Sequence, residues 1–369
     1  MIGKKALNLA AFTCILWVTG TTAYSQCNGS LFLCGQQYNE VAYLTTHNAY
    51  NSGEDGFMLP NQNFNITAQL NAGVRGLMIE VYDDSGTPTV YHGFSFMGSA
   101  PLLDYLNNIK IFLDANPAEV VTIILECYTT ANAIAGNINL AGLTSYLYTH
   151  TPGSNWPTLQ NMIDTDQRLV VFSDQDDADT TQGWYHYVWD YAVETHYTAH
   201  NISEFTCDFN RGDSINELFI LNHFITDVTF GVGIESEAII ANANPFFINR
   251  ALQCYTEKNK FPNFITIDFY DQGDGLHVVN QLNQPLYITE TQANTNLLVY
   301  PNPATNQITV ELKHPNKTET IQLYTYLGQL ITEIVVSKKA QLSINNLPKG
   351  LYALSLKNKP DSWSTFIKN

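Results

Sequence analysis

The sequence predicts an α/β fold, a (β/α) barrel of the TIM type followed by a small all-β sandwich. Near-continuous apolar strand segments alternate with segments of helical periodicity, which is typical of a parallel sheet buried on both faces. Six or seven such units fit one barrel. The chain then changes character after about residue 290, both in charge and in the spacing of its apolar residues. Its 369 residues leave room for a large barrel and a second, smaller domain.

The expected barrel strands share an apolar body and a polar residue at the exit. They cover residues 41–46, 73–82, 120–126, 168–174, 218–223 and 264–268, with a shorter strand at 89–93. Because the carboxyl ends of parallel barrel strands converge, we expect the polar exit residues to meet in space. The alternative for each is that it caps the following helix. These residues are His47, Glu80, His92, Glu126, Asp174, Asn222 and Asp268.

The charge distribution indicates where the two domains divide. Residues 26–293 hold seven Lys or Arg and 30 Asp or Glu, a balance of −23. From residue 294 onward there are eight Lys and four acidic residues, a balance of +4, in short alternating strands separated by turns. We therefore expect a barrel over residues 27–290 and a β-sandwich over residues 297–369.

Composition excludes some classes of partner. The formal net charge is −17, which argues against nucleic acid and against general adhesion to anionic membranes. Residues 1–26 have two lysines, an apolar run and small residues, the pattern of a secretory signal peptide. No other run approaches the roughly 18 to 20 apolar residues that span a bilayer, so we expect no transmembrane segment in the mature chain.

Five cysteines remain after such a cleavage, and an oxidising compartment permits disulfides. Cys27 and Cys34 close a short loop before the first strand, so we pair them. Cys207 and Cys254 both lie in irregular polar surroundings, and we pair these too. Cys127 lies in an apolar strand and is expected to be a free buried thiol.

The tail resembles the C-terminal sorting domain of the Por, or type IX, secretion pathway of Gram-negative bacteria. The matching motifs are Val299-Tyr300-Pro301-Asn302-Pro303, Leu347-Pro348-Lys349-Gly350-Leu351-Tyr352 and Phe366-Ile367-Lys368. The resemblance implies export through the periplasm to the cell surface or medium, with the type IX machinery as partner.

The body resembles the X domain of phosphatidylinositol-specific phospholipase C, within the superfamily of phospholipase C-like phosphodiesterases. The motifs include Thr46-His47-Asn48, Asn71-Ala72-Gly73-Val74-Arg75, His92-Gly93, Trp156-Pro157-Thr158-Leu159 and Asn263-Phe264-Ile265-Thr266-Ile267-Asp268. They follow one another in the family's order over nearly all of residues 27–285.

This resemblance implies a two-histidine mechanism. His47 falls on the family's general base and His92 on its general acid, and imidazoles suit both roles because their unperturbed pKa is near neutrality. Asp268 is expected to hold the tautomer of His47, or else to act as a cap or turn residue. His223 either lines the substrate pocket or is a satisfied core histidine.

The resemblance also implies a cation that meets the negative charge of the transition state, either Ca²⁺ or an arginine. Asn48, Glu80 and Glu126 fall on three of the four Ca²⁺-ligand positions. The fourth position, which carries the arginine in the metal-free form, is Tyr82 here, a residue we place in the substrate pocket. Asp83 or Asp84 is then expected to supply the missing carboxylate.

The sequence thus predicts a secreted phosphoric diester hydrolase acting on a phosphatidylinositol-like or related phosphodiester, with Ca²⁺ as cofactor. The alternative is a non-catalytic secreted barrel that binds a sugar or a lipid head group.

Overall fold

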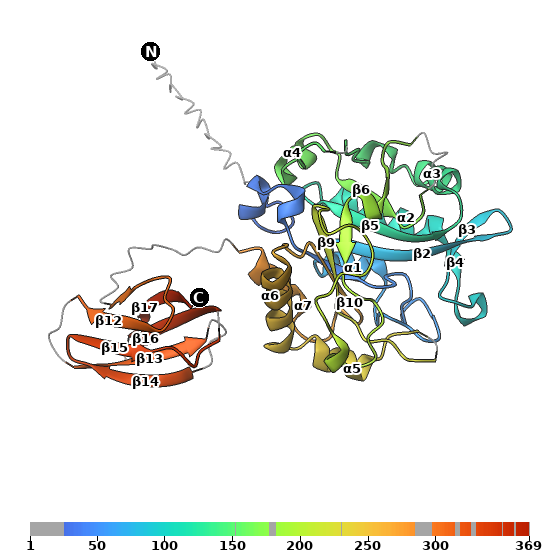
Figure 1. Cartoon of the computed structure of the whole chain (residues 1–369). Coiled ribbons are helices and arrows are strands. Elements are labelled where there is room, and N and C mark those ends of the chain that lie inside the picture. The colour runs from blue at the N-terminus through green and yellow to red at the C-terminus, as the bar shows by residue number, and fades with distance from the viewer. Residues whose placement is uncertain are drawn as a thin grey trace, which may run out of the picture.

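The computed structural model describes two separate folded units, a barrel and a C-terminal pair of sheets (Figure 1). The described residues are 26–151, 153–176, 182–229, 231–284, 297–313, 318–325, 330–348, 350–357 and 359–368. The expected signal peptide and the boundary near residue 290 lie outside these ranges, apart from Gln26.

The first unit is the expected barrel of parallel strands. The hydrogen-bonded order is β7-β6-β5-β2-β1-β10-β9-β8, and each neighbouring pair is parallel. Among these described strands, β7 and β8 end the path and do not pair. The strands are β1 (Tyr43–Thr46), β2 (Gly76–Asp84), β5 (Val121–Tyr128), β6 (Leu169–Ser173), β7 (Tyr185–Tyr187), β8 (Ala192–Glu194), β9 (Leu218–Asn222) and β10 (Phe264–Ile267).

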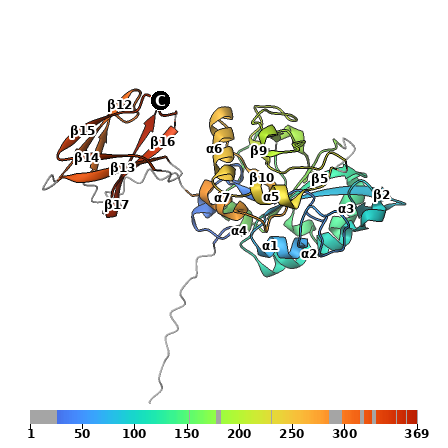
Figure 2. The ribbon, with the colours of Figure 1, turned by 90° about the horizontal axis from the view of Figure 1, so that it is seen from below.

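Helices surround the strands, as Figures 1 and 2 show. They are α1 (Ile66–Asn71), α2 (Leu102–Ala115), α3 (Ala131–Leu140), α4 (Leu159–Asp164), α5 (Glu235–Ala241), α6 (Phe246–Lys258) and α7 (Gly275–Leu282). The expected strand at 89–93 is instead an antiparallel arm, in which β3 (Thr87–Val90) pairs with the extended end of β2 and with β4 (Ala100–Pro101). That arm carries His92 to the barrel rim.

Alternate residues of each strand face different cores, because side chains in a strand point in turn to opposite faces. Tyr43, Phe172 and Phe264 belong to a core inside the barrel, and Leu44 and Ile265 belong to the layer between strands and helices. Stacked rings of Tyr38 and Trp156, with centroids 4.8 Å apart, pack into the inner core. A residue at the exit of a strand therefore points into the barrel only if it lies an even number of residues from an inward-facing residue of that strand. We call this inward parity.

Strands β7 and β8 were not predicted, because each has three residues and they lie in a stretch rich in Tyr and Trp. His186, in β7, is buried, with 3% of the residue exposed. The ring bonds the Val171 carbonyl through Nδ1 at 3.0 Å and accepts the His150 N–H through Nε2 at 3.0 Å. Both ring nitrogens of the neutral His186 imidazole therefore already have hydrogen-bond partners.

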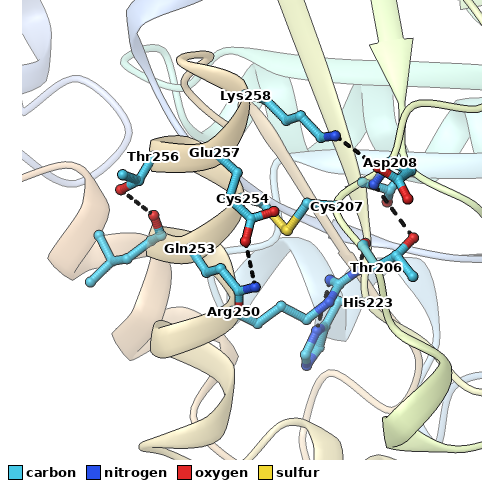
Figure 3. Close-up of a disulfide and its surroundings, with 12 residues drawn as sticks. Thr206, Cys207, Asp208, His223, Arg250, Gln253, Cys254, Thr256, Glu257 and Lys258 are labelled. Carbon is cyan, nitrogen blue, oxygen red and sulfur yellow. Dashed lines mark hydrogen bonds and ion pairs between the residues drawn. A yellow bond between two sulfur atoms is a disulfide. The ribbon is translucent and has the colours of Figure 1, made fainter. Parts of the chain in front are cut away.

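Both expected disulfides are present, Cys27–Cys34 and Cys207–Cys254, and Cys127 is free and buried. Figure 3 shows the second bond, which fastens the segment after β8 to α6. Next to it, Arg250 donates to His223 Nδ1 at 3.1 Å, and burial lowers the pKa of Arg250 to about 9. This buried polar network links β9 to α6.

The second unit is the expected small β-sandwich. One sheet has the order β11-β12-β15 and the other β14-β13-β16-β17, all antiparallel. The strands are β11 (Leu297–Tyr300), β12 (Gln307–Leu312), β13 (Glu319–Thr325), β14 (Leu330–Val336), β15 (Lys339–Ser343), β16 (Gly350–Leu356) and β17 (Lys359–Lys368). Ile308, Val310, Leu323 and Phe366 are part of their shared core. In the described part of the chain, no helix is long and apolar enough to cross a membrane.

Buried neutral histidines should make the barrel sensitive to acid. Burial lowers the pKa of His186 from 6.5 to about 4. Between pH 6.5 and pH 4, His186 is therefore protonated in the unfolded chain and neutral in the folded chain. The free energy of unfolding that is present above pH 6.5 is lost as the pH falls from 6.5 toward 4. The shift corresponds to a loss of up to about 3 kcal/mol in the free energy of unfolding from this residue.

Urea unfolding at pH 7.5 and pH 4.5 tests this expectation. The His186→Asn variant should lose less stability between the two pH values than the unmodified chain does. The exposed His196, replaced by Asn, is the matched control and should leave the pH dependence unchanged. Equal pH dependence in His186→Asn and the unmodified chain would contradict the assignment.

Candidate active site

His47 leaves β1 at the carboxyl end of the barrel and is held there by the neighbouring strand. Its N–H donates to the Ile267 carbonyl of β10 at 3.0 Å, and Asn48 then turns the chain with a left-handed φ of 45°. His47 has the same parity as Tyr43, which places its side chain on the inner side of the barrel. The ring stacks on Phe224, with centroids 3.8 Å apart and planes within 8°.

A buried carboxylate fixes this imidazole. His47 Nδ1 lies 3.0 Å from Asp268 Oδ1, and Asp268 is 1% exposed. The Asn61 amide also donates to Asp268 Oδ1, at 3.1 Å. Pairing at Nδ1 leaves Nε2 of His47 as the nitrogen available for proton transfer.

His92 is held in the same manner by a different carboxylate. His92 Nδ1 lies 2.8 Å from Glu80 Oε2, which also accepts from the Tyr50 hydroxyl at 3.1 Å. The Tyr82 hydroxyl donates to the other oxygen, Oε1. Burial, followed by the hydrogen bond to Glu80, raises the pKa of Tyr82, so this hydroxyl remains a neutral donor.

Two asparagines lie between the histidine–carboxylate pairs. The Asn48 amide is 3.3 Å from His92 Nδ1 and donates to Asn61 Oδ1 at 3.3 Å, and Asn61 in turn bonds Asp268. The two imidazoles thus belong to one connected polar network at the barrel mouth.

A cavity at this end of the barrel has a strongly acidic lining. Its charged or polar lining residues are His47, Asn48, Glu80, Glu126, Asp174, Glu194 and Arg211. Burial raises the pKa of Asp174, and the Cys127 N–H that donates to it at 2.9 Å opposes that rise.

Glu80 and Glu126 are opposite one another in the register of β2 and β5, and Asn48 is beside them in the cavity wall. Facing like charges on neighbouring strands repel, and carboxylate and amide oxygens are the donors that Ca²⁺ prefers. Tyr82 and Tyr128 each donate a hydroxyl to one of these carboxylates, at 2.6 Å for Tyr128 and Glu126. The three oxygen donors therefore fit a hard cation, although the described residues contain no group of three His, Cys, Asp or Glu side chains arranged to hold a metal.

Asp83 does not join them, which corrects the expectation for the fourth ligand. It is exposed, and its Oδ1 accepts the Gly86 N–H at 2.7 Å in the turn between β2 and β3. Asp84, the other candidate, is also exposed and bonds Ser85. Tyr82, which does reach Glu80, occupies the position instead.

The chain's family follows from a match over most of the barrel. The family model described as PI-PLC X 1 matches residues 33–283, well over half of the chain. The chain belongs to the PI-PLC X family. A second family model, for a secretion system C-terminal sorting domain, matches residues 298–368.

Relatives are found in plants and fungi. A PI-PLC X domain-containing protein of Arabidopsis thaliana is 28% identical over 278 residues, which cover 68% of this chain and 64% of the relative. PI-PLC X domain-containing protein 1 of Arthroderma benhamiae is 26% identical, covering 70% of this chain and 89% of the relative. The chain thus spans less than two thirds of the plant protein.

Among solved structures, the phosphatidylinositol-specific phospholipase C of Listeria monocytogenes is similar, with a TM-score of 0.48 and 18% identity. The similarity covers 69% of this chain and 97% of that one.

His223 is not in the pocket, and of the two alternatives expected for it the structure shows the satisfied core histidine. It is 0% exposed, its Nε2 is 2.9 Å from the Ala241 carbonyl, and its ring stacks on Phe247. Burial lowers its pKa well below the ordinary value. Parity explains the difference, because His223 shares its face of the strand with Leu221, which packs toward the helices.

Several residues of this PI-PLC X site were not predicted from the sequence. Asn61 and Tyr50 bond the two carboxylates from the loop after β1, and Phe224 stacks on His47. Arg211 and Glu194 form part of the cavity wall from β8 and the segment after it. All except Glu194 lie outside regular strands, where no periodicity marks the direction of a side chain.

Gly233 leaves room for Asp268 and provides a test of the site's packing. A Cβ at residue 233 would be 2.6 Å from Asp268 Oδ2 and 3.0 Å from a Phe269 ring carbon. Because Asp268 is buried against His47, we expect Gly233→Ala to lower the free energy of unfolding by about 1–3 kcal/mol.

Urea unfolding measures this effect, with Gly136→Ala as the matched control. Gly136 lies in α3, where an added Cβ meets nothing within 4 Å. There the substitution should be neutral or stabilise by about 0.5–1 kcal/mol, the usual difference between Gly and Ala in a helix. Unchanged stability in Gly233→Ala would show that Asp268 is free to move.

Proposed function

We propose that the barrel is a phosphoric diester hydrolase of the phospholipase C type, with His47 as general base and His92 as general acid. The observation that carries the proposal is the pair of imidazoles at one barrel mouth, each bonded through Nδ1 to its own buried carboxylate. This arrangement orients each ring through Nδ1, and we assign proton transfer to the opposite ring nitrogen, Nε2. The substrate we propose is a phosphatidylinositol-like or related phosphodiester.

The reaction needs two proton transfers. His47 Nε2 takes the proton of the attacking hydroxyl, whose oxygen forms a bond to phosphorus. The bond from phosphorus to the leaving oxygen breaks, and His92 gives that oxygen a proton. A substrate with a neighbouring hydroxyl forms a cyclic phosphate, which water opens with the two histidines in exchanged roles. Asp268 and Glu80 stabilise the positive charge on whichever imidazole is protonated.

We propose that Asn48, Glu80 and Glu126 hold a Ca²⁺ ion. Bound there, the ion would stabilise the extra negative charge that develops on the phosphoryl oxygens. Support comes from the donor set: two carboxylates in register across β2 and β5, and an amide beside them in one cavity. The Tyr82 and Tyr128 hydroxyls now bonded to these carboxylates would have to be displaced.

We further propose that the type IX machinery exports this enzyme through the periplasm of a Gram-negative bacterium, to the surface or the medium. The match of residues 298–368 to a secretion sorting domain and the signal-peptide pattern of residues 1–26 support this route.

Hydrolysis of a panel of phosphodiesters tests the function. Residues 27–369 are assayed on phosphatidylinositol, phosphatidylcholine and glycerophosphodiesters, with Ca²⁺ and with chelator. We expect activity that His47→Ala and His92→Ala each lower by at least about 100-fold, because each removes a proton-transfer group. His196→Ala, on the exposed rim, is the control and should retain activity.

The outcomes separate the parts of the proposal. Loss of activity in chelator supports the Ca²⁺ site, and indifference to chelator overturns it while leaving the two-histidine mechanism intact. A folded protein that binds but cleaves none of the diesters would favour the alternative, a secreted barrel that binds a sugar or lipid head group. For that alternative, the stacked rings of Tyr91, Tyr82 and Tyr128, with Tyr128 50% exposed, offer an aromatic face.

A further inference from the structure

Among the lysines and arginines of the barrel, Arg211 alone lines the acidic cavity. The barrel sequence contains seven Lys or Arg residues, all within the described ranges. The other six lie outside the cavity wall: Arg75, Lys110, Arg168, Arg250, Lys258 and Lys260. Four carboxylates, on Glu80, Glu126, Asp174 and Glu194, line the same wall as Arg211.

The guanidinium of Arg211 is held rigidly. Its carbon lies 4.4 Å from the centroid of Trp189 and 4.6 Å from that of Tyr197. Its Nε donates to Glu194 Oε1 at 2.5 Å and its Nη2 to Oε2 at 3.2 Å. This combination of a bidentate carboxylate and two aromatic rings fixes the plane and direction of the group.

The carboxylate beneath it is itself anchored. Glu194 is 2% exposed and is the last residue of β8. The Asn222 amide donates to its Oε2 at 3.0 Å and the Asn210 amide to its Oε1 at 3.2 Å. The buried Glu194 carboxylate thus accepts four hydrogen bonds, two from these amides and two from Arg211, more than a simple surface ion pair needs.

The exposed part of Arg211 remains available to a ligand. Its side chain is 43% exposed, and among the described residues Nη1 has no hydrogen-bond partner. A guanidinium in the cavity wall that has two nitrogens on a carboxylate and a third without a partner in the described chain suits an additional oxyanion.

We propose that Arg211 binds a phosphate oxygen of the substrate. This inference rests on the proposed function. A diester carries a negative charge into a cavity lined by four carboxylates, so a fixed positive charge from the chain itself would favour its binding whether or not the proposed Ca²⁺ ion is bound. Arg211, fixed by Glu194, Trp189 and Tyr197, supplies that cation from the segment after β8. Tyr82, by contrast, occupies the position from which the resemblance would supply an arginine.

Glu194 has a second effect that a purely structural role would not produce. It neutralises part of the Arg211 charge, so its removal should strengthen the attraction of Arg211 for an anion. Glu194→Gln keeps an oxygen for hydrogen bonding but removes the charge. The two partners of one ion pair should therefore change phosphate binding in opposite directions.

Binding of glycerophosphoinositol to the His47→Ala form of residues 27–369, measured by calorimetry, tests the inference without turnover. Arg211→Gln should weaken binding at least 10-fold, Arg211→Lys should weaken it less, and Glu194→Gln should strengthen it about 3-fold. Lys258→Gln is the matched control: it removes one positive charge on the outside of the barrel, where Lys258 pairs with Asp208, and should change affinity less than 2-fold. Circular dichroism and thermal unfolding verify that each variant is folded.

In the active form, Arg211→Gln should raise KM more than it lowers kcat, because a contact made in ground and transition states alike changes binding. Unchanged affinity in Arg211→Gln overturns the inference, and so does weakening by Glu194→Gln equal to that by Arg211→Gln, which indicates a structural pair. Hydrolysis that is independent of Arg211 leaves the proposed function standing without the inference. Arg211-dependent binding with no hydrolysis leaves the inference standing without the enzyme.

Discussion

The site depends on the pairing of the first barrel strand with the last. β1 and β10 are hydrogen-bonded along Tyr43–Thr46, and His47 continues that pairing through its bond to the Ile267 carbonyl. His47 and Asp268 are 221 residues apart in sequence, but each directly follows the last residue of its strand, β1 or β10. The pairing of these two strands therefore places His47 Nδ1 3.0 Å from Asp268 Oδ1. Because sheet register fixes the pair, any disturbance of β1 or β10 changes the orientation of His47. The proposed chemistry therefore depends on the pairing of β1 with β10 in the middle of the strand order.

Hydrogen-bond donors around the buried carboxylates determine how the other polar side chains are arranged at this end of the barrel. Burying a charged carboxylate is costly unless it is bonded. Asp268 is hydrogen-bonded to Asn61 and His47, and Glu80 to Tyr50, Tyr82 and His92. Glu194 accepts hydrogen bonds from two side-chain amides and an arginine. The other Asp268 oxygen, Oδ2, has no hydrogen-bond partner among the residues that the structure describes, and it lies against Gly233. Each carboxylate thus orients a nitrogen group, so the same bonds that satisfy burial also position His47 and Arg211 in the cavity wall and His92 beside Asn48.

The sequence predicted the fold and the strand-exit residues because long apolar strands have a strong signal. It located His47, His92, Asp268, Asn48, Glu80 and Glu126, all of which the structure brings to one end of the barrel. Of the two alternatives for His223, the structure shows the core histidine, and neither Asp83 nor Asp84, the two carboxylates offered as the fourth ligand, reaches the site. The period of two separates His223 and Asp83 from the inward-facing exit residues. His223 shares parity with Leu221 and Asp83 with Val81, both of which pack outward toward the helices.

Other parts could not be predicted from local pattern. β7 and β8 have three residues each, too few for a period to be recognised, and β8 carries Glu194 in the cavity wall. Arg211 is 17 residues after Glu194 in an irregular segment, and only the fold places its guanidinium on that carboxylate.

The same placement resolves an apparent conflict in charge. A barrel with a balance of −23 would be expected to repel anions. At the few ångströms that separate a ligand from a cavity wall, however, the nearest fixed charge outweighs distant screened ones. A single arginine held in place can therefore make an acidic protein receptive to a phosphate at one point, while Glu80 and Asp268 hold the two imidazoles.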